Sequence, residues 1–271
     1  MLGETSSGAP ENRLQPVLPS AEVRLELERV LEADTSLLGE VWRRLQAGET
    51  AEQIQAARGA SMPNFVWTYR RMIDALLTGD LPSAPTVALG CARRFRSLLR
   101  STAFSPQTEE MLRTNLAILE VSAANEVARS LEDKEAKEAT QRAEAQAIPG
   151  IYVYSLPHYL RHPYDEQANR TLFKVGHSNR SAIQRFRQQT RTTALPEDPV
   201  LLRIYPTTDD DAVAKESLFH GLLEAADHDR STARTGGTEW FLTSLRFLDQ
   251  IAASVGLEAR RVGEQLEAPD L

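Results

Sequence analysis

Apolar residues recur every three or four positions through the first half of the chain, which is the spacing of one face of an α-helix. The clearest case is the run Leu37, Leu38, Val41, Trp42 and Leu45, which Gly48 closes. The same pattern predicts helices over residues 21–31, 37–45, 51–57, 61–77 and 87–99, and a further helix that begins at Pro106. No glycine or proline interrupts residues 107–148, so this last helix is expected to run far.

At the two ends of this helical half, apolar residues are fewer and less regularly spaced. Residues 132–146 are rich in alanine, glutamate and lysine and contain few large apolar side chains. A helix of that composition has little to bury, so residues 123–148 are expected to form a solvent-exposed helical spacer. Residues 1–19 contain Gly, Ser, Pro and Asn without helical periodicity, which predicts a disordered tail.

A different pattern begins at Gly150. Residues 150–154, 172–176 and 200–205 are short runs of β-branched and aromatic residues with glycine or proline nearby, and they favour strands. The predicted fold is therefore α+β, with an all-helical N-terminal region over residues 20–122 and a small domain over residues 149–257. That domain should hold a three-stranded, mainly antiparallel sheet, and residues 258–271 should form a loose tail. The flanking helices are expected near residues 179–191, 209–226 and 243–253.

Composition limits the setting of the protein. The 271 residues contain a single cysteine, Cys91, which excludes an internal disulfide and a cysteine-rich zinc site. Its place in an apolar helical pattern favours a buried, inert thiol. No apolar run approaches bilayer length and the N-terminus lacks a secretory signal pattern, so the protein is expected to be cytoplasmic.

Charge is unevenly distributed along the chain. The formal net charge of -7 argues mildly against a nucleic-acid partner. Residues 167–191, however, contain no acidic residue and six basic ones, namely Arg170, Lys174, Arg180, Arg185, Arg187 and Arg191. A block of this kind predicts contact with a polyanion.

A second basic feature lies in the helical region. Arg70 and Arg71 are on the polar side of the helix over residues 61–77. This helix is the third of three, in an arrangement that resembles a helix-turn-helix, whose last helix enters the major groove of DNA. A three-helix bundle without a DNA role has the same pattern, so both interpretations stay open.

The order of motifs in the second half resembles the GIY-YIG nuclease superfamily. Gly150, Ile151 and Tyr152 match the first motif literally. Lys174-Val175-Gly176 stands in the place of the second, as in the phage and bacterial branch that has lysine there. The later motifs follow in the family's order, as Arg185-Phe186, then Glu216 with His220, then Glu239-Trp240-Phe241. The chain departs from the family in lacking an asparagine after Asn179.

This resemblance implies a metal-dependent endonuclease that hydrolyses DNA phosphodiester bonds. Glu216 would hold one Mg²⁺ or Mn²⁺ ion, Arg185 would brace the scissile phosphate, and His220 would orient the nucleophile or a phosphate. The general base would be Tyr152, Tyr154 or Lys174, a choice that the motifs leave open. The expected nucleic-acid contacts come from Tyr154, His177, Arg180, Arg187, Arg191, Arg70 and Arg71, with the helical region supplying binding and targeting.

Two other interpretations fit the same residues. In one, the chain is a catalytically inactive DNA-binding protein whose second domain only clamps phosphates. In the other, the substrate is RNA, since nothing in these motifs selects DNA.

Overall fold

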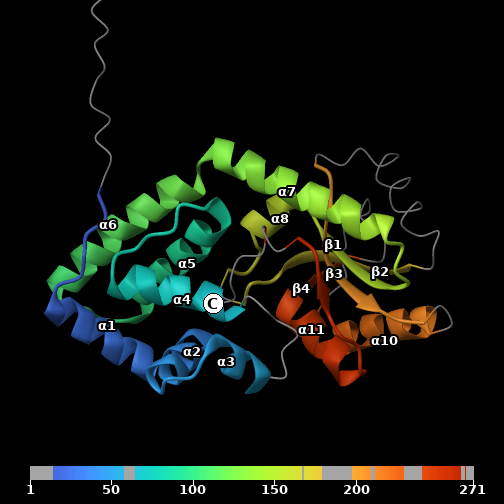
Figure 1. Ribbon diagram of the computed structural model, residues 1–271, viewed down its shortest axis with the longest axis horizontal. Helices are drawn as coiled ribbons and strands as arrows, with labels where there is room; N and C mark the ends of the chain where they lie inside the picture. Colours follow the sequence, from blue (N-terminus) through green and yellow to red (C-terminus); the bar gives the residue numbers. More distant parts are fainter. Residues whose placement is uncertain are drawn as a thin grey trace, which may run out of the picture.

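The helical first half folds into a lobe of its own, beside an α+β lobe built from the second half (Figure 1). The computed structural model describes residues 15–57, 65–166, 168–178, 197–208, 211–228, 240–263 and 266. Helices α6 and α7 run along one side of the molecule and join the two lobes (Figure 1). The helices before the first strand are α1 (Ala21–Ala33), α2 (Leu37–Gln46), α3 (Ala51–Ala57), α4 (Phe65–Leu77), α5 (Pro85–Ser101), α6 (Pro106–Ala123) and α7 (Glu126–Ala145).

Side-chain caps set where several of these helices begin. At the start of α3, the Thr50 N–H donates to Gln53 Oε1 at 2.8 Å and the Gln53 N–H donates to Thr50 Oγ1 at 3.3 Å. This reciprocal pair is a capping box. The single long helix expected after Pro106 is wrong, because Asn125 caps a new helix by accepting a hydrogen bond from the Ala128 N–H at 3.1 Å. The chain turns there, and α6 and α7 are separate helices.

Helices α1 to α6 share one apolar core. Cys91 is fully buried in it, and burial raises the pKa of its thiol to about 12, which agrees with an inert thiol.

The segment before α1 is hydrogen-bonded to this lobe. The Val17 N–H donates to Oδ1 of the buried Asn115 on α6 at 2.8 Å, and Asn115 Nδ2 donates back to Val17 O at 2.9 Å. Residues 15–19 of the expected disordered tail are therefore held in place, and residues 1–14 lie outside the described residues.

The sheet has five strands in the order β4-β2-β1-β3-β5, and each neighbouring pair is antiparallel. β1 (Gly150–Ser155), β2 (Thr171–Ser178) and β3 (Val200–Pro206) are the three predicted strands. β4 (Trp240–Thr243) and β5 (Arg260–Arg261) are too short for an alternating pattern to show in the sequence. The α+β class is confirmed, and the predicted count of three strands is wrong. β5 also ties the start of the expected loose tail to β3.

Helices cover both faces of the sheet (Figure 1). α10 (Ala212–Ala225) and α11 (Leu245–Ser254) pack on one face, where Phe219 and Leu248 share a core with Ile151 and Val153 of β1. These two helices correspond to those predicted near residues 209–226 and 243–253. The helix predicted near residues 179–191 lies outside the described residues. A short helix, α8 (Pro157–Arg161), follows β1. None of the helices in the described ranges is long and apolar enough to cross a bilayer.

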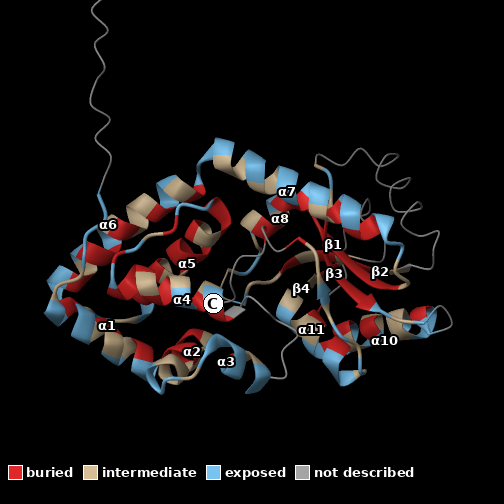
Figure 2. Ribbon diagram, in the orientation of Figure 1, coloured by how far each residue is buried: buried red, intermediate tan, exposed pale blue. Residues whose placement is uncertain are grey.

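α7 covers the opposite face of the sheet. Its Ala143 packs against Tyr152 and Tyr154, and its Thr140 Oγ1 accepts a hydrogen bond from the Leu201 N–H at 3.0 Å. Figure 2 shows a buried side of α7 toward the sheet and an exposed side facing away from it. The helix expected as an exposed spacer is therefore part of the α+β lobe, because its small alanine side chains allow close approach to the strands.

Candidate functional site

The residues predicted to form one site are divided between the two faces of the sheet. Residues directly opposite each other in an antiparallel pair share a face. The β1–β2 register pairs Tyr154 with Lys174, so Tyr152, Tyr154 and Lys174 lie on the face that α7 covers. His177 is three residues beyond Lys174 along β2 and faces the other way, toward α10, where it meets Glu216.

Both tyrosine hydroxyls are buried under α7. Tyr152 is 3% exposed, and its hydroxyl donates a hydrogen bond to the backbone carbonyl of Ile148. The hydroxyl of Tyr154 donates to Glu144 Oε1 of α7 at 3.4 Å, and the two tyrosine rings stack with their centroids 6.3 Å apart. A buried hydroxyl that donates to a carbonyl is not placed to take a proton from water, so this arrangement does not support Tyr152 as the general base.

Lys174 lies in register between Tyr154 of β1 and Trp240 of β4, and its side chain is half-buried. The residue opposite Tyr152 in this register is Gly176. Trp240 meets the ring of Tyr159 edge-on, with the centroids 6.2 Å apart.

On the opposite face, Glu216 and His177 form a close pair. The carboxylate accepts a hydrogen bond from the backbone N–H of His177 at 3.1 Å through Oε1, and Oε2 lies 2.5 Å from Nδ1 of the same residue. Because an ionised carboxylate only accepts hydrogen bonds, we assign the proton of the imidazole to Nδ1, which leaves Nε2 as an acceptor. The side chain of His177 is 30% exposed and that of Glu216 is 14% exposed. Solvent therefore reaches this pair.

His220 follows Glu216 by one turn of α10 and anchors the helix to β2. Its Nε2 lies 3.0 Å from the backbone carbonyl of Val175, to which it donates, and its ring packs on Phe241 with the centroids 4.8 Å apart. The structure thus brings Glu216, His177 and His220 to one side of β2. It does not bring the hydroxyl of Tyr152 to this group.

The donor set around Glu216 fits only some metal ions. Within the described residues, no group of three or more His, Cys, Asp and Glu side chains is arranged to hold a metal. A carboxylate has about four lone-pair positions, and His177 occupies two of those on Glu216. Mg²⁺ commonly takes one or two carboxylates and keeps several waters, so Glu216 fits such an ion and the set does not fit a fully protein-coordinated zinc.

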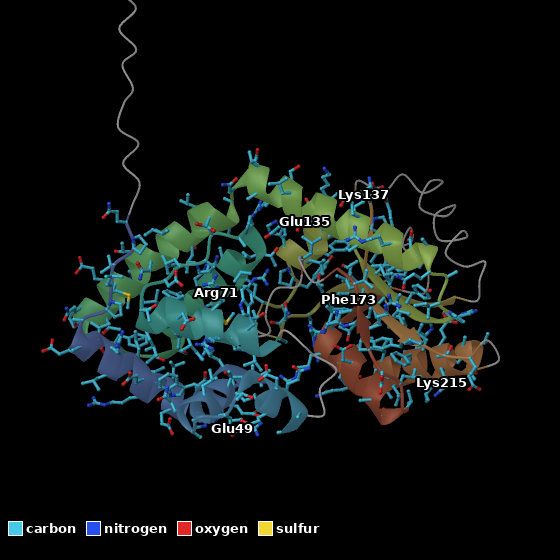
Figure 3. The ribbon with its side chains drawn as sticks, viewed as in Figure 1. Glu49, Arg71, Glu135, Lys137, Phe173 and Lys215 are labelled. Atoms are coloured by element: carbon cyan, nitrogen blue, oxygen red, sulfur yellow. The ribbon has the colours of Figure 1, made fainter. Side chains whose placement is uncertain are left out.

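Most of the predicted arginine contacts cannot be placed. Arg180, Arg185, Arg187 and Arg191 lie outside the described residues. Of the arginines predicted on α4, Arg70 is exposed, and the guanidinium of Arg71 lies 5.2 Å over the ring of Trp67 while bonding Asp80 at 3.1 Å. Figure 3 shows Arg71 on the helical lobe. Residues 58–64, which join α3 to α4, are outside the described ranges, so the turn of a helix-turn-helix cannot be placed.

Sequence reasoning missed the contact between His177 and Glu216. It assigned His177 to nucleic-acid contact and Glu216 to a metal ion, without pairing the two. The alternation of side chains along β2 could have indicated it. Successive residues of a strand point to opposite faces, so Val175 and His177 lie on the face opposite Lys174, which is the face that α10 covers.

Comparison with known proteins corrects the resemblance to GIY-YIG nucleases. The family model that matches is that of the T5orf172 domain, a different domain family, and no GIY-YIG model matches. The three-residue motifs misled because part of their pattern has a local cause. A Cβ atom on Gly150 would lie 2.4 Å from the carbonyl oxygen of Tyr205, so packing alone requires glycine there.

The other two comparisons add no relatives, since neither a curated protein nor a solved structure matches the chain. The T5orf172 match covers residues 150–256. This range includes strands β1 to β4 and helices α8, α10 and α11, and it ends before β5. That family is nuclease-like and DNA-associated, so this part of the chain is similar to domains with a DNA-related role.

Proposed function

We propose that residues 150–256 hydrolyse phosphodiester bonds of DNA, with the Glu216–His177 pair as the reaction centre. The observation that carries this proposal is the carboxylate of Glu216, whose two oxygens both contact the partly exposed His177. His177 stands at the end of β2, within the basic stretch over residues 167–191, and Arg180 and Arg185 follow it in the sequence. The T5orf172 match over the same residues supports DNA as the substrate.

Hydrolysis of a phosphodiester needs a group that removes a proton from the attacking water and positive charge that meets the developing charge on phosphate. His177 supplies the first. Glu216 holds the proton of the imidazole at Nδ1, so Nε2 can accept a proton from water. His220 fixes α10 on β2 and thereby keeps Glu216 in reach of His177. Arg185, by its place in the basic stretch, is assigned to the scissile phosphate.

Glu216 is also the residue that would hold a divalent cation such as Mg²⁺ or Mn²⁺. When bound, that ion would neutralise charge on the phosphate and lower the pKa of a coordinated water. The helical lobe is assigned to DNA binding and targeting, with Arg70, Arg71 and the exposed Trp67 of α4 as its candidate contacts.

The test is cleavage of supercoiled plasmid with Mg²⁺ or Mn²⁺, with EDTA as the control for metal dependence. We expect Glu216→Ala to abolish nicking, and His177→Ala to slow it by roughly 10²–10⁴-fold, the usual contribution of a general base. Glu224→Ala, at an exposed position on the same helix, should cleave like the wild type.

Circular dichroism and DNA binding of each variant separate loss of chemistry from loss of fold. A wild-type protein that binds plasmid but never nicks it with either ion would refute the nuclease assignment. That outcome would leave a DNA-binding protein that clamps phosphates.

A further inference from the structure

One junction between the two lobes lies where α5 of the helical lobe contacts the C-terminal end of α8. Arg93 of α5 reaches across this junction, and its Nη2 donates a hydrogen bond to the backbone carbonyl of Arg161 at 2.9 Å. The side chain of Arg93 is only 1% exposed. A charged side chain therefore lies inside the junction, where its N–H groups need partners.

Most of those partners are missing among the described residues. Nε and Nη1 of Arg93 are buried and have no hydrogen-bond partner there. An arginine side chain carries one N–H on Nε and two on each terminal nitrogen, and it does not lose its charge in proteins. Native structures satisfy nearly all buried donors, through the protein, ordered water or a bound ion, so Nε and Nη1 of Arg93 call for such a partner.

The nearest carboxylate is too far away to be that group. Glu166 Oε1 lies 4.0 Å from Nε of Arg93, and Glu166 Oε2 lies 3.6 Å from Nη1 of Arg96, which is beyond hydrogen-bond distance. The side chain of Glu166 is 43% exposed. It therefore stands at the solvent side of the two arginines, and it attracts them by charge without a hydrogen bond to either.

Positive charge also acts on a neighbouring histidine. The pKa of His162, beside this junction, is lowered from its ordinary value of 6.5, first by desolvation and then by the positive charges of His158, Arg129, Arg93 and Arg161. These side chains act on His162 from α5, α7 and α8. Arg161 is paired with Asp133 and Arg96 also with Glu120, so an anion entering the junction would be attracted chiefly by Arg93.

We propose that Arg93 and Arg96 bind a phosphate group, in the position that the carboxylate of Glu166 occupies in this structure. A phosphate suits the site because arginine presents paired N–H groups that match its oxygens. In the complex with DNA the phosphate belongs to the DNA backbone, and Glu166 turns outward to solvent. Glu166 then competes with the DNA phosphate for the two arginines and is displaced when DNA binds. Both lobes contact the same duplex at this junction. The inference rests on the proposed DNA partner and does not depend on cleavage.

The first arm of the test measures binding without chemistry. The affinity of the full chain for a fluorescent DNA duplex is measured by anisotropy in EDTA over a range of salt concentrations. Glu166→Gln should bind several-fold more tightly, since the competing charge is gone. Arg96→Gln should bind several-fold more weakly, with a salt slope smaller by about one phosphate contact. Glu135→Gln, at an exposed position on α7 (Figure 3), is the matched control and should not change affinity.

The second arm identifies the source of the phosphate. Inorganic phosphate should raise the Tm of the wild type and compete with DNA, and both effects should vanish in Arg96→Gln. If inorganic phosphate raises the Tm but no variant changes the affinity for DNA, the site binds a free phosphate compound and the DNA backbone is not its ligand. Arg93→Lys repeats the test at the buried position, provided that its circular dichroism is native.

If Glu166→Gln leaves both DNA affinity and the phosphate response unchanged, the inference is overturned, and the arginines only hold the lobes together. Failure of the proposed nuclease would appear as uncut plasmid and would not alter these binding results.

Discussion

The ion pair between Arg203 of β3 and Asp249 of α11 fixes that helix on the sheet. Nε of Arg203 lies 3.1 and 3.2 Å from the two carboxylate oxygens of Asp249, and the Tyr205 hydroxyl donates to Asp249 Oδ1 at 2.8 Å. The Arg203 side chain is 1% exposed and that of Asp249 is 9% exposed. Both charges are therefore withdrawn from water and depend on each other.

Asp249→Ala removes the carboxylate and leaves the guanidinium of Arg203 buried without this counter-charge. Loss of one partner of a buried ion pair costs about 3–5 kcal/mol, so we expect the free energy of unfolding to fall by that amount. Tyr205→Phe removes one hydrogen bond from the same carboxylate and should cost only about 1 kcal/mol. The difference between the two variants isolates the charge.

Urea denaturation of the full chain, followed by circular dichroism and tryptophan fluorescence, measures these values. The double variant Arg203→Met with Asp249→Leu tests the electrostatic reasoning, because a buried ion pair replaced by apolar residues often loses little stability. It should be more stable than Asp249→Ala. A loss under about 1 kcal/mol in Asp249→Ala, or a double variant that is no better, would show that burial of the pair is not what sets this stability.

Two further predictions concern buried polar groups of the same lobe. Tyr152→Phe should cleave plasmid at nearly the wild-type rate and lose about 1 kcal/mol of stability, since its buried hydroxyl donates to Ile148 O and is not turned toward Glu216. A strong loss of cleavage with a native fold would return the role of general base to this tyrosine. Burial, followed by the charge of Arg170, lowers the pKa of His228 below its ordinary value of 6.5. The unfolded chain then binds a proton that the folded chain does not, so the free energy of unfolding should fall as pH drops below that value. Urea titrations at several pH values measure this dependence. In His228→Gln the free energy of unfolding should fall less steeply with decreasing pH, and the remaining fall should be the part due to His162, whose pKa is also lowered. The same pH dependence in His228→Gln as in the wild type would contradict the role given to His228.

Local pattern was enough to predict most helices and the three central strands. The apolar spacing of residues 37–45 and the capping box of Thr50 and Gln53 are properties of neighbouring residues, and both appear in the structure as α2 and the start of α3. The same holds for β1, β2 and β3, whose residues favour an extended chain wherever they pack. Sequence also located the basic stretch and the carboxylate Glu216.

The layer order and the pairing of the strands came only from the tertiary structure. Alanine-rich α7 looks like an exposed spacer in sequence, but its small side chains face the tyrosines of β1 across the sheet. β4 and β5 have too few residues to show a pattern and exist because β2 and β3 offer open edges for pairing.

The candidate site shows the same limit. The sequence supplied Tyr152, Lys174, His177 and Glu216 as polar residues near one another in motif order. Alternation along β1 and β2 sends the tyrosine and lysine to one face, and packing of α10 on the other face brings Glu216 to His177, 39 residues away in the chain. Helix and strand periodicity act over a few residues, whereas register and layer order minimise exposed apolar surface over the whole domain. The composition of the site therefore follows from sequence, and its division between two faces follows from the fold.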